Sequence, residues 1–412
     1  MMPLLACANS APRASPVQPG PVNRAGNIII RDQEDSILYT PPQLCPVILA
    51  GGASARLWPV SDTNRPKWDL RLFGQRTLLQ EAWRRARAVA RAPQCLVVAG
   101  SAHARRIRAS LPELPRENLL VEPAARDTAG ALAYAAGVLL RARPRGVLLV
   151  LPGDHVIEPL ERFVRCARTA ARVAEHEGAL VTFGIQPRAP ATCYGYVRRG
   201  APLETARAGE PRAFRVRAFK EKPDAATAQA YLASGEYYWN GGIFAFPIAA
   251  LLAELEAHLP EHAALAKALA VAGSRQARTR CLRARFPRLP KVSIDFGVME
   301  HARNVATIAA DFNWDDIGSW TAVGAHLERR EENACGPAVD LRAIDSSKNV
   351  VVAPGKQVAL IGVSGLAVVQ DGQRLLVCRL DQDQRVKEVA QRAGTRRRQK
   401  PDPRITRKDA NI

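Results

Sequence analysis

Short apolar runs that end in glycine or in an aspartate turn alternate with longer helical segments through most of this chain. Each run is short enough to be one buried strand; the runs lie at 45–52, 95–100, 146–155 and 179–185. Helical spacing of apolar residues appears between them, at 77–90 and 127–142. Strands that alternate with helices predict an α/β fold with a doubly wound, mostly parallel, Rossmann-like sheet. Such a sheet binds ligands beyond the carboxyl ends of its strands.

The pattern changes after about residue 338 to short β-rich runs separated by glycine, aspartate and proline turns. These runs lie at 349–354, 357–363, 365–370 and 374–380, as in a small β-domain or β-helix. We therefore expect a poorly ordered N-terminal tail, a large α/β domain, a β-helix-like domain and a basic tail, at 1–43, 44–332, 338–392 and 393–412.

The formal net charge of +20 over 412 residues comes from an excess of arginine. A charge of this size is found in proteins that bind nucleic acid, but it also arises from an arginine-rich solvated surface. The basic residues are scattered and are not interleaved with aromatics, so we expect no nucleic-acid partner. No apolar run approaches the roughly 20 residues of a membrane-spanning helix, and no membrane partner is expected.

The eight cysteines are isolated in the sequence, and no pair has the C-x-x-C spacing of a zinc or redox site. Free thiols in a reducing cytoplasm fit this pattern best.

The turn after the first predicted strand contains Gly51 and Gly52, followed by the cation Arg56 and, a short loop later, Lys67. A glycine turn lets backbone N–H groups approach phosphates, whose charge nearby cations neutralise. The alternative is an ordinary strand-to-helix turn with surface cations. A Walker A loop and a G-x-G-x-x-G dinucleotide motif are both absent here, which argues against a P-loop NTPase and an ordinary dehydrogenase.

A second turn, after the strand that ends at Leu151, contains Asp154. A carboxylate in this position can hold Mg²⁺ against phosphate oxygens, or it can simply cap the following helix. Three later segments combine polar groups with glycines or aromatics, as carbohydrate sites do, although each alone fits a turn or a core cluster; they lie at 221–223, 239–244 and 313–320.

Taken in order, these segments resemble the mannose-1-phosphate guanylyltransferases, a branch of the sugar-phosphate nucleotidyltransferases. The resemblance covers about residues 45–392 and is carried by AGGASARLWP, PKWDL, EPAARDTA, LPGDHVI, FGIQPRAPATCYGYV, FKEKPD, YYWNGGIFAF, SIDFGVME and WDDIGSW. It implies a nucleotidyltransferase domain followed by a left-handed β-helix-like domain. It also implies the reaction of GTP with α-D-mannose 1-phosphate to give GDP-mannose and pyrophosphate.

The resemblance also implies a role for each matching site residue. Gly51 and Gly52 would bind phosphates, while Arg56 and Lys67 neutralise their charge. The Mg²⁺ cofactor would be held by Asp154 and Asp316. Two further groups would face the guanine and the sugar phosphate respectively: Glu122, Asp127 and Thr128, and Gly195, Glu221, Lys222 and Asn240.

Several positions depart from the family pattern. They cluster in the turn that contains Gly51 and Gly52, called the phosphate loop, and in the segment 122–129, called the base block. Ser54 and Ala55 replace glycine and threonine, Trp68-Asp69 replaces Gln-Phe, Asp127 replaces asparagine, and Gly241 replaces serine. Asp69 in particular could form an ion pair with Lys67 and so reduce the positive charge that Lys67 offers to phosphates. These changes leave two alternatives open, a catalytically silent or regulatory relative, and the same chemistry with another nucleotide or sugar.

Longer family members carry a second, metal-dependent isomerase domain of the cupin type. No histidine follows His326 in this sequence, so it offers no imidazole ligand for such a site, and we expect no isomerase activity. Whether the chain forms a homo-oligomer is left open by the sequence.

Overall fold

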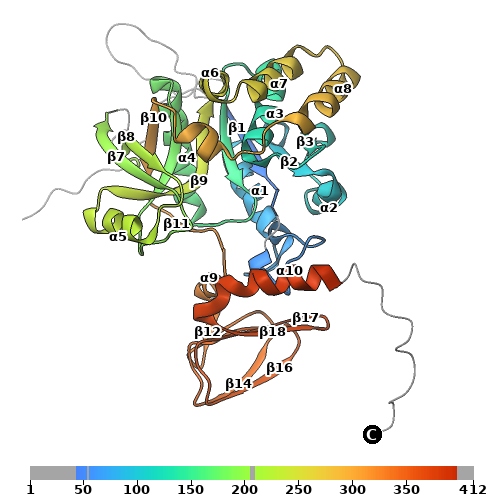
Figure 1. Ribbon diagram of the computed structural model, residues 1–412, viewed down its shortest axis with the longest axis vertical. Helices are drawn as coiled ribbons and strands as arrows, with labels where there is room; N and C mark the ends of the chain where they lie inside the picture. Colours follow the sequence, from blue (N-terminus) through green and yellow to red (C-terminus); the bar gives the residue numbers. More distant parts are fainter. Residues whose placement is uncertain (1–42, 53–54, 205–208, 397–412) are drawn as a thin grey trace, which may run out of the picture. The chain divides into compact units, whose positions relative to one another are not determined.

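The computed structural model describes residues 43–52, 55–204 and 209–396. The predicted tails, 1–43 and 393–412, lie almost entirely outside these residues, and so does Ser54. What the sequence predicts for the two tails and for Ser54 therefore stays a prediction. The described part contains an α/β domain and, after it, a β-helix-like domain (Figure 1).

A nine-stranded sheet is the centre of the α/β domain. Its strands follow in space the order β3 (Leu119–Glu122), β2 (Leu96–Gly100), β1 (Leu44–Leu49), β4 (Val147–Pro152), β9 (Tyr237–Pro247), β6 (Leu180–Ile185), β10 (Val305–Ala309), β8 (Ala213–Lys220) and β7 (Tyr196–Leu203). Strands β8 and β9 run opposite to the other seven, so the predicted α/β fold with a mostly parallel sheet is confirmed.

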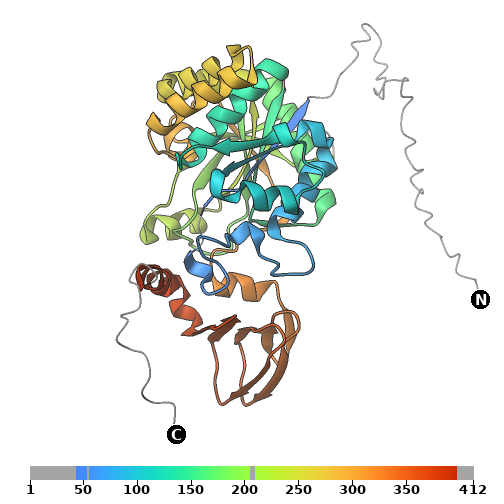
Figure 2. The ribbon, with the colours of Figure 1, turned by 90° about the vertical axis from the view of Figure 1, so that its right-hand side faces the viewer.

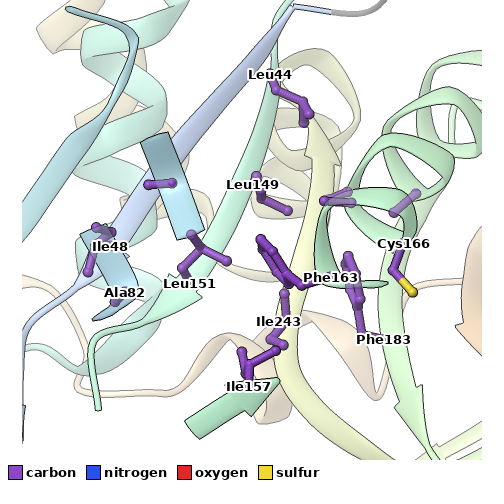
Figure 3. Packing of buried hydrophobic residues seen from close by; sticks show 14 of the residues in the cluster. Leu44, Ile48, Ala82, Leu149, Leu151, Ile157, Phe163, Cys166, Phe183 and Ile243 are labelled. Atoms are coloured by element: carbon purple, nitrogen blue, oxygen red, sulfur yellow. The ribbon is translucent and has the colours of Figure 1, made fainter. Parts of the chain in front are cut away.

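Helices cover both faces of this sheet because the apolar side chains of its strands alternate between them. In β4, Leu149 and Leu151 face one layer and Leu148 and Val150 the other. The first layer includes α1 (Leu78–Val89), α2 (Ala104–Ser110), α4 (Leu160–Glu177) and α5 (Ala225–Ser234), and Figure 3 shows part of its core. The second includes α3 (Asp127–Ala142), α6 (Ile248–His258) and α7 (Pro260–Val271), with α8 (Arg275–Arg285) packed on α7.

Local signals in the sequence explain where the main helices begin and end. Thr77 and Gln80 form a capping box at the start of α1, in which each side chain accepts from the other residue's backbone N–H. Helix α4 ends at Glu177 and is capped by Gly178, which has a φ of 58°, the left-handed conformation that favours glycine.

The C-terminal domain is built from parallel strands that repeat about every 17 residues. Strands β13 (Asn333–Cys335), β15 (Val350–Val352) and β17 (Leu366–Asp371) form one ladder, and β14 (Asp340–Ile344) and β16 (Gln357–Ile361) the other. Antiparallel strands β12 (Glu328–Arg330) and β18 (Arg374–Arg379) flank the first ladder. Helices α9 (Trp320–Ala325) and α10 (Val386–Arg396) complete this region, whose stacked strands are visible in Figure 2.

A buried amide ladder joins successive coils of this domain. The side-chain oxygen of Asn333 accepts from both the backbone N–H and the side-chain amide of Asn349, at 3.1 and 2.9 Å. The side-chain oxygen of Asn349 then accepts from the backbone N–H of Leu366 at 2.8 Å. The coil therefore satisfies its buried polar groups internally.

Candidate active site

The glycine turn and the aspartate turn leave the sheet side by side. Strands β1 and β4 are parallel neighbours, and their last paired residues are Leu49 and Pro152. The N–H of Gly153 donates to the carbonyl oxygen of Leu49 at 3.0 Å, and a Cβ at Gly153 would lie 3.0 Å from that oxygen. Gly52, with a φ of 85°, is exposed at the end of the first turn, so its backbone is open to a ligand.

A second pairing brings Asp316 to the same place. Strand β5 (Val156–Glu158) starts directly after the aspartate turn, and β11 (Asn313–Asp315) ends directly before Asp316. The two strands are antiparallel, with Val156 opposite Asp315. Asp154 and Asp316, which are far apart in the chain, therefore converge beyond the carboxyl end of β4.

Lys67 connects these two aspartates. The residue is only 6% exposed, and its Nζ lies 2.7 Å from Oδ2 of Asp154. The same ammonium donates to the backbone carbonyl oxygen of Asp316. Burial alone would raise the pKa of the Asp154 carboxyl, but the Lys67 ammonium holds that pKa below its usual value. Asp154 is thus kept ionised beside a buried cation.

Asp316 is held by Tyr194 and lies beside Arg56. The Tyr194 hydroxyl donates to Oδ1 of Asp316 at 2.9 Å. A Cβ at Gly318 would lie 3.2 Å from this Oδ1 and 3.4 Å from Nη1 of Arg56, so both groups line the same small space. Nη1 of Arg56 is also 3.5 Å from Oε1 of Gln384, in the C-terminal domain.

Buried neighbours fix the turn that contains Asp154. The Trp314 indole N–H donates to Nδ1 of His155 at 3.2 Å, and burial lowers the pKa of His155 to about 4, so its ring stays neutral near pH 7. Behind the turn, Nη2 of Arg85 donates to the His155 carbonyl oxygen at 2.9 Å. Arg85 is only 2% exposed, and burial lowers its pKa to about 10, which leaves the guanidinium charged.

A bulge in β9 brings Asn240 to Gly195. The pairing of β9 with β6 shifts register between Thr182 and Gly184, opposite Gly241-Gly242, and the φ of Gly242 is 65°. The N–H of Asn240 donates to the Gly195 carbonyl oxygen at 2.8 Å. The Asn240 side chain is fixed at both ends: its oxygen accepts from the Thr182 hydroxyl and its nitrogen donates to Oδ1 of Asp295, each at 2.8 Å.

A carboxylate with a free oxygen lies next to this amide. Oε1 of Glu221 accepts from the Lys222 ammonium, whereas its buried Oε2 has no partner among the described residues. A Cβ at Gly195 would collide with this Oε2, so only glycine leaves the carboxylate its position. Burial, with a further contribution from the Glu221 charge, raises the pKa of Asp295 to about 6. This pocket presents acceptors suited to sugar hydroxyls.

The base block lies at the start of α3, joined to the segment before Asp295. The Thr128 hydroxyl accepts from the N–H of Ile294 at 2.8 Å. Asp127 has a φ of 62° and accepts from the Thr128 N–H, a conformation that aspartate and asparagine both tolerate. Burial and the nearby Asp127 raise the pKa of Glu122 to about 7.

The donor set around Lys67 fits a magnesium ion. Mg²⁺ is bound through one or two carboxylates together with substrate phosphates and water, and the carboxylates of Asp154 and Asp316, held by Lys67 and Tyr194, offer such ligands. No group of three or more histidine, cysteine, aspartate or glutamate side chains that could hold a metal occurs among the described residues.

Comparisons with known proteins agree with this geometry. Residues 45–331 match the nucleotidyl transferase family, and residues 342–392 match the MannoseP isomerase/GMP-like beta-helix domain. The chain is 39% identical to the xanthan biosynthesis protein XanB of Xanthomonas campestris pv. campestris (strain B100), over 84% of this chain and 72% of that protein. It is 38% identical to the mannose-1-phosphate guanylyltransferase of Escherichia coli (strain K12), over 85% and 73% respectively.

The chain belongs to the mannose-1-phosphate guanylyltransferase family. A crystal structure described as mannose-1-phosphate geranyltransferase, from Thermus thermophilus, is 35% identical. It superposes with a TM-score of 0.77 over 85% of this chain and 99% of that one. The nucleotidyltransferase fold with a C-terminal β-helix domain, expected from the sequence, is therefore confirmed.

One expected departure from the guanylyltransferase pattern has a different outcome. Asp69 does not draw off the charge of Lys67, because its Oδ2 pairs with Nη1 of Arg106 at 2.6 Å. Trp68 is 1% exposed and packs in the core, edge-on to the ring of His103. The interpretation that Asp69 could take up the charge of Lys67 was therefore wrong, because each residue has a different partner.

Some residues of the site carry no assignment from the sequence. Tyr194, His155 and Asp295 lie inside segments of this chain that match family blocks, but no local pattern distinguishes them. Arg85 is one of several arginines on an amphipathic helix. Asp295 and Tyr194 are positioned by hydrogen bonds to residues 55 and 122 positions away in the chain. Short-range spacing in the sequence cannot predict such long-range contacts.

Proposed function

We propose that this chain transfers GMP from GTP to α-D-mannose 1-phosphate, forming GDP-mannose and pyrophosphate. A phosphate oxygen of the sugar phosphate attacks the α-phosphorus of GTP and forms a new P–O bond. The bond from that phosphorus to the bridging oxygen breaks, and the leaving pyrophosphate takes its electron pair. Such a transfer asks the protein mainly for positioning and charge neutralisation.

One observation carries this proposal. The buried Lys67 ammonium contacts both the carboxylate of Asp154, just after β4, and the backbone carbonyl oxygen of Asp316, in a chain that belongs to this family. Lys67 and Arg56 would neutralise the triphosphate and the negative charge that develops on pyrophosphate. The exposed backbone of Gly51 and Gly52 would lie against the phosphates.

The two carboxylates also support this assignment. Asp154 and Asp316 would hold Mg²⁺, which when bound supplies positive charge to the phosphate oxygens. The protein itself orders these two carboxylates, through Lys67 on one side and Tyr194 on the other.

The remaining residues would select the substrates. The unpaired oxygen of Glu221 and the side chains of Lys222 and Asn240 would contact the sugar phosphate above Gly195. Glu122, Asp127 and Thr128 would face the guanine, whose N1–H and exocyclic amine are donors that suit carboxylate acceptors. A charged Glu122 would therefore favour GTP over ATP.

We also propose that the reaction takes place in the cytoplasm. The cysteines of the described part are free thiols, which suits a reducing compartment. Among the described residues, no helix is both long and apolar enough to cross a bilayer.

Pyrophosphate release tests the proposal. The purified chain is incubated with Mg²⁺, mannose 1-phosphate and one of GTP, ATP, UTP or dTTP, and then with GTP and glucose 1-phosphate. We expect release with GTP and mannose 1-phosphate at a rate at least tenfold above every other pair. Release with a different nucleotide would overturn the base assignment, and no release from folded protein would favour a silent relative.

A further inference from the structure

A cavity of about 680 Å³ lies apart from the site formed by Lys67, Asp154 and Asp316, on the side of the sheet where β3 is the edge strand. Side chains of α2, β3, α3, α7 and α8 line it, and Figure 1 shows these elements gathered at that edge. Of the site residues discussed above, Glu122 lines it, whereas Lys67, Asp154 and Asp316 do not. It is therefore a separate space that touches the base block at one point.

Six arginines from different elements line this cavity: Arg108, Arg116, Arg141, Arg275, Arg278 and Arg283. Nη1 of Arg141 donates to the Ala272 carbonyl oxygen at 2.5 Å. The other five guanidinium groups make no hydrogen bond or ion pair with any residue that the structure describes. Two carboxylates, Glu117 and Glu122, also line the cavity, and burial raises the pKa of Glu122 to about 7, so the surplus charge is strongly positive.

Like charges gathered around one space repel each other, and a bound anion would relieve that repulsion. Guanidinium groups present paired N–H donors that match phosphate oxygens. The positions of the arginines on four separate segments suit an anion with several phosphate groups rather than a single small ion.

The floor of the cavity is apolar. Leu119, Leu269 and Leu282 are buried there, and the Tyr134 ring lies beside them, edge-on to Phe286 at 6.3 Å between centroids. Apolar walls with a few charged groups at the rim are typical of sites for ligands that combine a flat ring with polar groups, and the volume lies within the usual range for such sites.

We propose that this cavity is a second nucleotide-binding site, which takes a nucleotide with two or more phosphates. The base would lie on the leucines and Tyr134, and the phosphates would reach the arginines of α8 and their neighbours. This proposal goes beyond the transfer reaction and does not depend on it.

Helix α8 provides matched variants for a test. Arg278 and Arg283 line the cavity, whereas Arg280 and Arg285, on the same helix, do not. The double variants Arg278→Ala/Arg283→Ala and Arg280→Ala/Arg285→Ala remove the same charge from the same helix. Comparing them separates a site from the general attraction of a basic surface.

Binding of radiolabelled GDP is measured by equilibrium dialysis for the wild type and both double variants, each also combined with Lys67→Ala to weaken the transfer site. With Lys67→Ala, we expect about one equivalent of GDP to remain bound. Its dissociation constant should rise at least about tenfold with Arg278→Ala/Arg283→Ala and change less than twofold with Arg280→Ala/Arg285→Ala. Pyrophosphate release by the cavity double variant with intact Lys67 should stay within twofold of the wild type.

Three results would overturn the proposal. Equal weakening by both double variants would show a diffuse effect of charge. Pyrophosphate alone competing as tightly as GDP would remove the base from the assignment. A 20-nucleotide DNA that binds the cavity more tightly than GDP would make this face a nucleic-acid surface. Failure of the transfer reaction alone would leave GDP binding at the cavity intact, so the two proposals fail separately.

Discussion

Tyr194 and Asp316 are 122 residues apart in the chain, and the Tyr194 hydroxyl donates a 2.9 Å hydrogen bond to Oδ1 of Asp316. Tyr194 directly precedes Gly195, next to the free oxygen of Glu221. One short segment therefore touches both the proposed metal carboxylate and the proposed sugar pocket.

Tyr194→Phe should raise the Mg²⁺ concentration for half-maximal activity by about tenfold. A hydrogen bond to a charged group contributes about 1.5 kcal/mol or more, and its loss leaves Asp316 less well ordered. Initial rates over a Mg²⁺ titration measure the change. Tyr238→Phe is the control, because the Tyr238 hydroxyl has no hydrogen bond among the described residues. Equal Mg²⁺ dependence in both variants would contradict the role of Tyr194.

Lys67→Ala should lower kcat by about 100-fold or more, because a buried cation at the proposed phosphate site is lost. Asp154→Asn, which keeps the size of the side chain, should abolish turnover while leaving the fold intact. Pyrophosphate release gives the rates, and circular dichroism checks the fold. The exposed Lys356→Ala is the control. Normal turnover in either site variant would remove that residue from the catalytic assignment.

Gly195→Ala should raise KM for mannose 1-phosphate at least tenfold and leave KM for GTP nearly unchanged. The added Cβ would collide with Oε2 of Glu221 and push the carboxylate out of the sugar pocket. Steady-state kinetics with each substrate varied in turn separate the two constants. Gly273→Ala adds a methyl group where nothing lies within 4 Å, and it should change neither constant. A rise in KM for GTP alone would contradict the assignment of Glu221 to the sugar phosphate and would indicate a contact with GTP instead.

The pKa of Asp295 predicts how stability changes with pH. Burial raises this pKa from 3.8 to about 6, so the folded protein binds a proton that the unfolded chain releases between these values. The contribution of Asp295 to the free energy of unfolding therefore falls as pH rises from about 4 to about 6. Relative to Asp295→Asn, the wild type should lose up to about 3 kcal/mol across this window.

Urea denaturation at several pH values between 4 and 7 measures this difference. The exposed Asp340→Asn serves as the control and should run parallel to the wild type. If the Asp295→Asn and wild-type curves keep a constant separation, the Asp295 carboxyl does not titrate in the way its surroundings indicate.

Asn349→Ala should destabilise the C-terminal domain by about 3 kcal/mol, because it leaves buried partners in two neighbouring coils without hydrogen bonds. Thermal or urea unfolding measures the loss. Gln357→Ala removes a surface amide that donates to Asp340, and we expect a change below about 0.5 kcal/mol. Similar losses in the two variants would argue against the amide ladder as a stabilising element.

The alternation of strands and helices was enough to predict the α/β domain and to place Asp154 at the end of a buried strand. It could not give the direction of β9, because the apolar run after Asn240 reads alike for either direction, and the antiparallel pairing depends on β4 and β6. The bulge at Gly241-Gly242 follows from that pairing as well.

Side-chain partners far apart in the chain were equally out of reach. Asp69 looked like a competitor for Lys67 because the two residues are near in sequence, yet its partner is Arg106, 37 residues away. Only the folded chain decides which cation lies closest to a carboxylate. Site positions that follow from strand ends could therefore be predicted, and those that follow from tertiary pairing could not.

The segment directly before Lys67 is tied to the C-terminal domain by two ion pairs. Arg65 pairs with Asp371 at 3.0 Å, and Asp62 with Arg374 at 3.1 Å. These contacts span more than 300 residues. During synthesis Lys67 leaves the ribosome well before Asp371 and Arg374, because more than 300 residues separate its loop from these partners. Lys67, proposed above as a catalytic residue, thus acquires its full surroundings only after Asp371 and Arg374 have been made, and a nascent chain halted before Asp371 would hold the strands of the main sheet without the contacts that brace this loop.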